Sequence, residues 1–240
     1  MTFLLMIPLM GKGFSQEIIY YNIFHNGASI SFLNVLGSPA PPMAQEIALR
    51  ILKQPFAPEK IKSEYYQISV NQGIVWQGKN VVQYDYTPII PDRFRHVLWV
   101  LPESSEIVKL EIYDTEDQMV FCAICLECNN LNTIRERQAR RAQRQEKVEN
   151  REIYNGFSVV STSRTRCGNI RTSYSDGLNR FSIFKMPVSV QKNTEPEKFV
   201  VYGNYVFNQD LNGFRYTVVG SIPFDKMTRM IQKIGENSEE

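Results

Sequence analysis

The sequence has little of the chemistry on which enzymes depend. Only two histidines occur in 240 residues, His25 in a predicted turn and His96 in a predicted strand. A general base must lie within hydrogen-bond reach of its partner, and the sequence places neither histidine beside a plausible nucleophile. Gly11-Lys12-Gly13 lacks the spacing of a phosphate-binding loop. We therefore expect a protein that is not an enzyme and that uses no cofactor.

Long apolar runs are also lacking. A membrane-spanning helix needs about 20 apolar residues, whereas the apolar run at residues 2–10 is much shorter. Gly13-Phe14-Ser15 then places small residues where a signal peptidase would cut, although no Lys or Arg precedes the run. Residues 1–15 are therefore predicted to be a signal peptide or its remnant, with a buried first strand as the alternative. A signal peptide would imply export to the periplasm or cell envelope.

The chain as a whole has no large excess of positive or negative charge. The formal net charge is only +2, so no overall field attracts nucleic acid. Residues 132–151, however, hold six Arg and one Lys against three Glu, with no aromatic residue that could stack on bases. We interpret this segment as a helical linker; the alternatives are contact with an acidic partner or anionic lipid, and a nucleic-acid-binding module. The arginines available for such electrostatic contact are Arg137, Arg140, Arg141 and Arg144.

Cysteine is sparse, and three of the four cysteines form a C-x2-C-x2-C run at Cys122, Cys125 and Cys128. The flanking residues favour a strand, in which Cys122 and Cys128 would lie about 20 Å apart at roughly 3.3 Å per residue. Zinc–sulfur bonds of about 2.3 Å cannot bridge that separation, so a metal site would require this segment to be a loop. Small buried residues, or one disulfide such as Cys128 with Cys167, are the interpretations that the pattern favours.

Alternating apolar and polar runs predict mostly antiparallel β-structure, because the runs are short and are separated by turn signals. The predicted strands are 17–24, 28–36, 64–71, 81–87, 94–101, 107–114, 119–128, 154–160, 170–174, 178–184, 199–208 and 214–219. Helices are predicted at 43–54 and 223–234. Asn71-Gln72-Gly73 is interpreted as a turn. Asp114-Thr115-Glu116-Asp117 is also interpreted as a turn, because it lacks the glycine and the alternating ligands of a calcium loop. The fold class that follows is α+β.

The clearest local signal is a hairpin in the second half of the chain. Alternating runs at 170–174 and 178–184 flank Ser175-Asp176-Gly177. Asp-Gly between two such runs favours a tight turn, because glycine adopts positive φ without a steric penalty. We therefore interpret this triplet as a turn whose role is backbone geometry.

The hairpin resembles a motif of the MucB/RseB family, whose members are envelope regulators that bind an anti-sigma factor. The residues that carry the resemblance are Tyr174, Ser175, Asp176, Gly177 and Leu178. The strand that opens with Tyr154-Asn155-Gly156-Phe157 and the terminal stretch 217–223 are similar to the family's C-terminal domain. The resemblance implies a small antiparallel sheet packed by a C-terminal helix.

Residues 78–120 resemble the LolA-like N-terminal domain of the same family, through Gly78-Lys79, Asp92-Arg93-Phe94-Arg95 and Leu98-Trp99. That domain is an open half-barrel of antiparallel strands whose concave face takes acyl chains or a lipidated partner. Val100-Leu101 replaces the Asp that usually follows Leu-Trp, and only a short segment comes before the matching part, so an incomplete half-barrel is expected. The residues predicted to face lipid are Tyr84, Tyr86, Leu98 and Trp99.

The resemblance implies two domains in an α+β protein. We expect a LolA-like domain at 16–131, an Arg-rich helical linker at 132–152, and a MucB/RseB C-terminal-like domain at 153–236. The implied function is a non-enzymatic regulator that binds the periplasmic domain of a membrane anti-sigma factor and senses lipid or lipoprotein, with peripheral membrane contact. The alternative function is a LolA-like carrier of lipoprotein or lipid, or a periplasmic chaperone.

Overall fold

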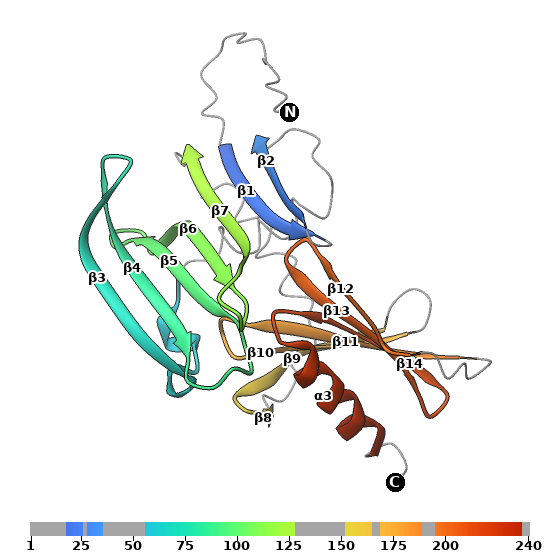
Figure 1. The fold of residues 1–240 in the computed structure, drawn as a ribbon. Helices are drawn as coiled ribbons and strands as arrows, with labels where there is room; N and C mark the ends of the chain where they lie inside the picture. Colours follow the sequence, from blue (N-terminus) through green and yellow to red (C-terminus); the bar gives the residue numbers. More distant parts are fainter. Residues whose placement is uncertain are drawn as a thin grey trace.

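The structure is a computed structural model of the 240-residue chain. It describes residues 18–25, 28–35, 56–127, 152–164, 169–188 and 195–236. Within these residues the chain forms two antiparallel sheets and one C-terminal helix (Figure 1). No helix in the described part is long and apolar enough to cross a membrane.

Seven strands form the first sheet, in the spatial order β2-β1-β7-β6-β5-β4-β3. They are β1 (Ile18–His25), β2 (Ala28–Val35), β3 (Tyr66–Trp76), β4 (Lys79–Pro88), β5 (Arg95–Leu101), β6 (Glu106–Tyr113) and β7 (Met119–Glu127). Two 3-10 helices, η1 (Pro58–Lys60) and η2 (Ser63–Tyr65), lead into β3. The sheet is not closed, because β2 and β3 lie at opposite edges (Figure 1).

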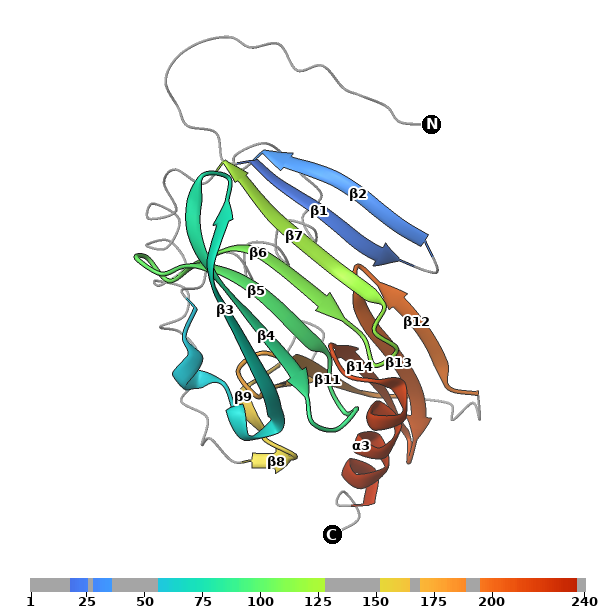
Figure 2. The same ribbon diagram turned by 60° about the vertical axis from the view of Figure 1, so that its left-hand side comes forward.

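Seven strands also form the second sheet, in the order β12-β13-β14-β11-β10-β9-β8. They are β8 (Glu152–Tyr154), β9 (Phe157–Arg164), β10 (Ile170–Ser175), β11 (Arg180–Pro187), β12 (Glu197–Val201), β13 (Asn204–Leu211) and β14 (Phe214–Gly220). The helix α3 (Phe224–Glu236) follows β14 and lies along the second sheet (Figure 2). Each strand pairs with its neighbours in an antiparallel register.

Side-chain alternation gives the first sheet two apolar faces. One face carries a large buried cluster that includes Tyr86, Leu98 and Phe121, and the other a smaller cluster that includes Val97 and Trp99. β5 contributes to both clusters because it is an inner strand of the sheet, and six of its seven residues are buried. An inner strand buried on both faces explains why this segment reads as a nearly continuous apolar run.

The helix α3 buries its apolar face against the second sheet. Met227 and Ile231 are 0% exposed and pack with Phe207 and Val218 of the sheet. Pro223 precedes the first helical residue, a place where its missing N–H and fixed φ favour helix initiation. The helix predicted from apolar spacing is therefore confirmed, and so is the α+β class with mostly antiparallel strands.

One predicted turn is wrong. β3 continues through Asn71-Gln72-Gly73, where the register with β4 shifts between Asn71 and Ile74 and Gly73 has a φ of 75°. These residues form a β-bulge, in which glycine adopts positive φ as it does in a turn but the chain does not reverse. The chain reverses at Gln77-Gly78, where both residues have positive φ and where the sequence also predicts a turn.

Two further turns divide segments that the sequence predicts as single strands. Tyr202-Gly203 separates β12 from β13 within the predicted strand 199–208. Asn155-Gly156 separates β8 from β9 within the predicted strand 154–160. The predicted signal peptide at 1–15, the helix at 43–54 and the Arg-rich linker lie outside the described residues, and the domain limits stay a prediction.

Candidate functional site at the junction of the two sheets

The predicted hairpin exists and reaches the first sheet. β10 pairs with β11 from Ile170 opposite Lys185 to Ser175 opposite Arg180, and Gly177 in the turn has a φ of 103°. The Asp176 carboxylate accepts hydrogen bonds from the amides of Leu178 and Asn179, which fixes the turn. The turn is therefore held by a side chain as well as by glycine, and Asp176 is only 1% exposed.

Asp176 also binds Arg93, which comes from the segment just before β5. Arg93 Nη1 lies 2.8 Å from Asp176 Oδ2, and both side chains are fully buried. Arg93 Nε donates to Asp92 Oδ1 at 2.7 Å, and Arg93 Nη2 donates to the carbonyl oxygen of Asn155 at 2.5 Å. The Asn155 side chain in turn donates to Asp92 Oδ2. One buried guanidinium thus connects the first sheet with two turns of the second.

Aromatic rings enclose the same guanidinium. The Arg93 Cζ atom lies 4.6 Å from the centre of the Tyr65 ring and 4.9 Å from that of Phe157. Cation–π attraction is strongest where water is excluded. Tyr65 belongs to η2 and Phe157 to β9, so these rings also come from both sides of the junction.

A second set of hydrogen bonds surrounds Asn179. Its side-chain nitrogen donates to the Phe94 carbonyl oxygen, and its side-chain oxygen accepts from the Phe94 amide. It also donates to the Tyr66 hydroxyl, which itself donates to Asp176 at 2.6 Å. Asn179 is 0% exposed. A buried amide that satisfies backbone groups of the other sheet is costly to replace, because each lost partner leaves a buried polar atom unpaired.

Glycine is required at two points of this junction because the chains approach closely. A Cβ on Gly177 would clash with the backbone of Lys60 and Ile61, and a Cβ on Gly156 would clash with the Tyr65 ring. Both glycines also have positive φ. The Asp-Gly pair of the hairpin is thus required by the junction as well as by the turn.

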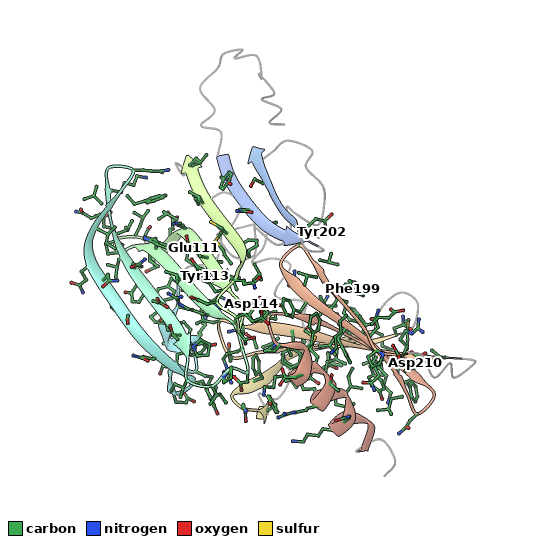
Figure 3. The ribbon with its side chains drawn as sticks, in the orientation of Figure 1. Glu111, Tyr113, Asp114, Phe199, Tyr202 and Asp210 are labelled. Carbon is green, nitrogen blue, oxygen red and sulfur yellow. The ribbon has the colours of Figure 1, made fainter. Side chains whose placement is uncertain are left out.

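The sheets also touch beside the β6–β7 turn. The Tyr205 hydroxyl donates to Asp114 Oδ2 at 2.8 Å, while Asp114 Oδ1 accepts from the amides of Glu116 and Gln118. Figure 3 shows Asp114 between the two sheets. The Tyr205 ring packs 4.9 Å from Phe94. The predicted hairpin turn at Asp114 is confirmed, and its carboxylate joins the sheets as well.

Burial and charge fix the ionisation of the junction. Burial would lower the pKa of the Arg93 guanidinium, but its hydrogen bond to Asp92 and the neighbouring negative groups raise that pKa overall, so Arg93 stays charged. Burial and the adjacent Asp176 raise the pKa of the Tyr66 hydroxyl well above its ordinary value, so Tyr66 stays protonated. Burial lowers the pKa of His96 to about 4, so this histidine is neutral at pH 7.

The junction is suited to holding the two sheets in one orientation. A histidine that is buried and neutral, with Nδ1 directed at the Phe94 carbonyl oxygen, has no access to a substrate. Within the described ranges, no group of three or more His, Cys, Asp or Glu side chains could hold a metal ion. The arrangement holds the two sheets together, because removing one partner from a buried ion pair costs much free energy.

The four residues predicted to face lipid do not lie on one face of the first sheet. Tyr84 pairs with Leu98 and lies with Tyr86 on one face, whereas Trp99 points to the other because neighbouring side chains in a strand alternate. The Lys109 Nζ atom lies 4.0 Å from the centre of the Trp99 ring. The grouping of Trp99 with the other three residues is therefore wrong. Tyr86 and Leu98 are buried, and Tyr84 is half-buried.

The cysteines lie partly outside the described residues. Cys122 is free and buried, and burial is the main cause that raises the pKa of its thiol to about 11. Cys125 is disulfide-bonded. Cys128 and Cys167, the pair predicted as one possible disulfide, lie outside the described residues. The four arginines predicted for electrostatic contact, Arg137, Arg140, Arg141 and Arg144, lie outside the described residues.

Sequence reasoning singled out Asp176 only as a turn residue and did not identify its partners in this site. Asp92 and Arg93 appear in the sequence only as part of a family motif, and Asn179 carries no signal of its own. The partners are distant in the chain, since Arg93 and Asp176 are 83 residues apart. A charged pair next to a turn is normally solvated, and only the fold shows that this one is buried.

The sequence was compared with models of known protein families. Residues 142–235 match the family model of the MucB/RseB C-terminal domain. The chain therefore carries a MucB/RseB-like C-terminal domain. The Asp176 hairpin lies within the MucB/RseB match, and the resemblance predicted from the sequence is confirmed. No curated protein matches the sequence.

Solved structures of MucB share the fold over 89% of this chain. The Pseudomonas aeruginosa MucA/MucB complex is 17% identical, with a TM-score of 0.58 over 89% of this chain and 90% of that chain. MucB in complex with MucA(peri) is 16% identical, with a TM-score of 0.57 over 89% of this chain and 90% of the other. A structure of MucB without a stated partner gives 16% identity, a TM-score of 0.57 and 89% coverage of each chain. The likeness to MucB thus extends over both sheets.

Proposed function

We propose that this protein is a non-enzymatic regulator of the cell envelope that binds the periplasmic part of a membrane anti-sigma factor. The observation that carries the proposal is the likeness of 89% of the chain to MucB, which has been solved in complex with MucA(peri). The MucB/RseB C-terminal domain match supports the same assignment independently of the fold. In this proposal the protein acts by binding alone.

The junction supports a partner site that depends on both sheets. Arg93, Asp176 and Asn179 are fully buried and join the sheets through charged and amide hydrogen bonds. A partner segment that touches both sheets would therefore meet two surfaces already held in position, and it would lose less free energy in ordering them. Regulation then requires only that a second ligand favour a different state of the same protein.

Lipid or lipoprotein sensing is the second part of the proposal. The half-buried Tyr84 packs 4.7 Å from Phe56, and both rings pack against the large apolar cluster. In this proposal an acyl chain contacts the apolar surface that these rings form. Recovery of lipoproteins but no anti-sigma protein from an envelope extract would favour a LolA-like carrier instead. A fractionation experiment tests the envelope location, and an intact Met1 on cytoplasmic protein would overturn it.

The binding test uses purified protein and the periplasmic segments of membrane anti-sigma proteins from the same organism, measured by isothermal titration calorimetry. We expect one segment to bind the wild-type protein. Asp176→Asn should weaken that binding, because it disturbs the junction, whereas Asp117→Asn should leave it unchanged, because Asp117 pairs with Arg95 at an exposed site. Folded wild-type protein that binds none of these segments would refute the proposed function.

A further inference from the structure

β3 is an unpaired edge of the first sheet and the longest of its edge strands. It has 11 residues, against 8 for β2 at the opposite edge. Its sequence, Tyr-Gln-Ile-Ser-Val-Asn-Gln-Gly-Ile-Val-Trp, contains no charged residue and no proline. Proteins usually protect exposed edges with lysine, proline, covering segments or bulges, because the free N–H and C=O groups otherwise pair with another chain. Within the part of the chain that the structure describes, the bulge is the protection that β3 has.

The outer part of β3 is also apolar on one face. Ile68 and Val70 are 40% and 47% exposed and pair with Tyr86 and Tyr84, so they share the face of these tyrosines. Val75 is 66% exposed and pairs with Asn80; the bulge returns it to the same face. Among the described residues, β3 therefore carries a row of exposed β-branched side chains. The strand lies at the outer edge of the first sheet (Figure 1).

The bulge limits where a straight partner strand can pair. The register with β4 is regular from Tyr66 to Asn71 and shifts after that residue. Within the regular part, polarity is symmetric about Ser69: one position away lie Ile68 and Val70, and two positions away lie Gln67 and Asn71. An antiparallel copy of the strand centred on Ser69 would place apolar residues opposite apolar residues and amides opposite amides.

We propose that β3 pairs with β3 of a second copy of this chain, antiparallel and about a two-fold axis at Ser69. Ile68 then faces Val70 of the second copy, and Gln67 faces Asn71 of the second copy. Cross-strand pairs of this kind stabilise a sheet, and the absence of charge removes like-charge repulsion across the axis. The result is one continuous sheet through both copies.

A second copy fits this edge better than another occupant because a two-fold contact between two β3 strands leaves no further β3 edge free to pair. Pairing of β3 with β2, which is also uncharged, would be head-to-tail and would continue into open chains. A two-fold contact uses the same surface on both copies and stops at a dimer. This self-pairing goes beyond the partner binding proposed above and does not depend on it.

Charge substitution at Ser69 tests the register directly. Ser69→Asp places two negative charges opposite each other at the axis, and Ser69→Lys places two positive charges there. Size-exclusion chromatography with light scattering should show a concentration-dependent dimer for the wild type and monomers for each variant alone. An equimolar mixture of the two variants should restore the dimer, because opposite charges then face each other. Ser104→Asp, in the exposed turn between β5 and β6, is the matched control and should dimerise like the wild type.

The mixture separates lost pairing from lost folding. A variant that fails to fold gives no dimer in the mixture and loses its circular dichroism spectrum, and Ser69→Thr then serves as a second variant that should keep the wild-type dimer. The proposal is overturned if the wild type stays monomeric at millimolar concentration. It is also overturned if Ser69→Asp dimerises like the wild type, which would assign the contact to β2 or another surface. Protection of β3 amides from hydrogen exchange only when a different protein is bound would likewise overturn it.

Discussion

The replacement of Asp176 by Asn removes one charge from the junction while keeping the shape of the side chain. In the wild-type protein, Asp176 Oδ1 accepts from two amides of its own turn, and Oδ2 accepts from Arg93 and from the Tyr66 hydroxyl. The Asn side-chain oxygen can keep the two turn bonds. Its NH2 group then faces the N–H of Arg93, which can only donate, so the buried bond to Arg93 is lost. The Tyr66 hydroxyl can rotate and accept from the NH2 group, and the turn is spared.

Breaking one side of a buried ion pair costs about 3–5 kcal/mol, because the remaining charge stays buried without its partner. Asp92 remains beside Arg93 and offsets part of this loss, so we expect Asp176→Asn to lower the free energy of unfolding by about 3 kcal/mol. The matched control is Asp117→Asn, because Asp117 also pairs with an arginine but its side chain is 71% exposed. Exposed pairs contribute at most about 1 kcal/mol.

Urea denaturation followed by circular dichroism measures both variants under the same conditions. The slope of the transition shows whether both sheets still unfold together. If Asp176→Asn destabilises the protein no more than Asp117→Asn does, then the buried network does not hold the sheets together and the argument from burial is refuted.

Two further predictions concern backbone and pH. Gly177→Ala should destabilise the protein by more than the roughly 1–3 kcal/mol of positive-φ strain, because its Cβ clashes with the backbone of Lys60. Gly213→Ala, with φ of 76° and no atom within 4 Å of its Cβ, should show the strain alone, and equal losses in thermal unfolding would contradict the close approach. The pKa of His96 falls from 6.5 to about 4 on folding, so the unfolded chain binds the extra proton between these values. The contribution of neutral His96 to the free energy of unfolding is therefore complete above pH 6.5. It is lost as pH falls toward 4, by about 3 kcal/mol in total. His96→Asn should remove that part of the pH dependence, and an unchanged profile would show that other groups cause it.

Local signals in the sequence predicted the parts of the fold that depend on neighbours in the chain. The Asp-Gly turn at Gly177 and the spacing of Met227 and Ile231 gave the hairpin and the helix, because each depends on a few adjacent residues. The bulge at Gly73 was misread as a turn because both structures use glycine at positive φ. Only pairing with β4 distinguishes them, and that pairing is not local.

The site itself was largely beyond sequence reasoning. The hairpin was found, but Asp176 was assigned to turn geometry alone, since nothing near it in the chain indicates an arginine partner. Trp99 was grouped with Leu98 although adjacent strand residues face opposite ways. Burial on both faces of β5 hides the alternation that would have separated them. Contacts between distant segments, rather than residue type, decide the role of each of these side chains.

The position of β1 in the first sheet has a consequence for the order of folding. β1 pairs with β2, its neighbour in the chain, and with β7, so that Ile18 lies opposite Glu127. The hairpin of β1 and β2 can form early, but its second edge stays open until β7 has been synthesised and has found it. Such distant pairings close large loops and slow folding. A nascent chain therefore carries an exposed strand edge until residue 127 of its 240 residues has been made, and it has most to gain from a chaperone during that interval.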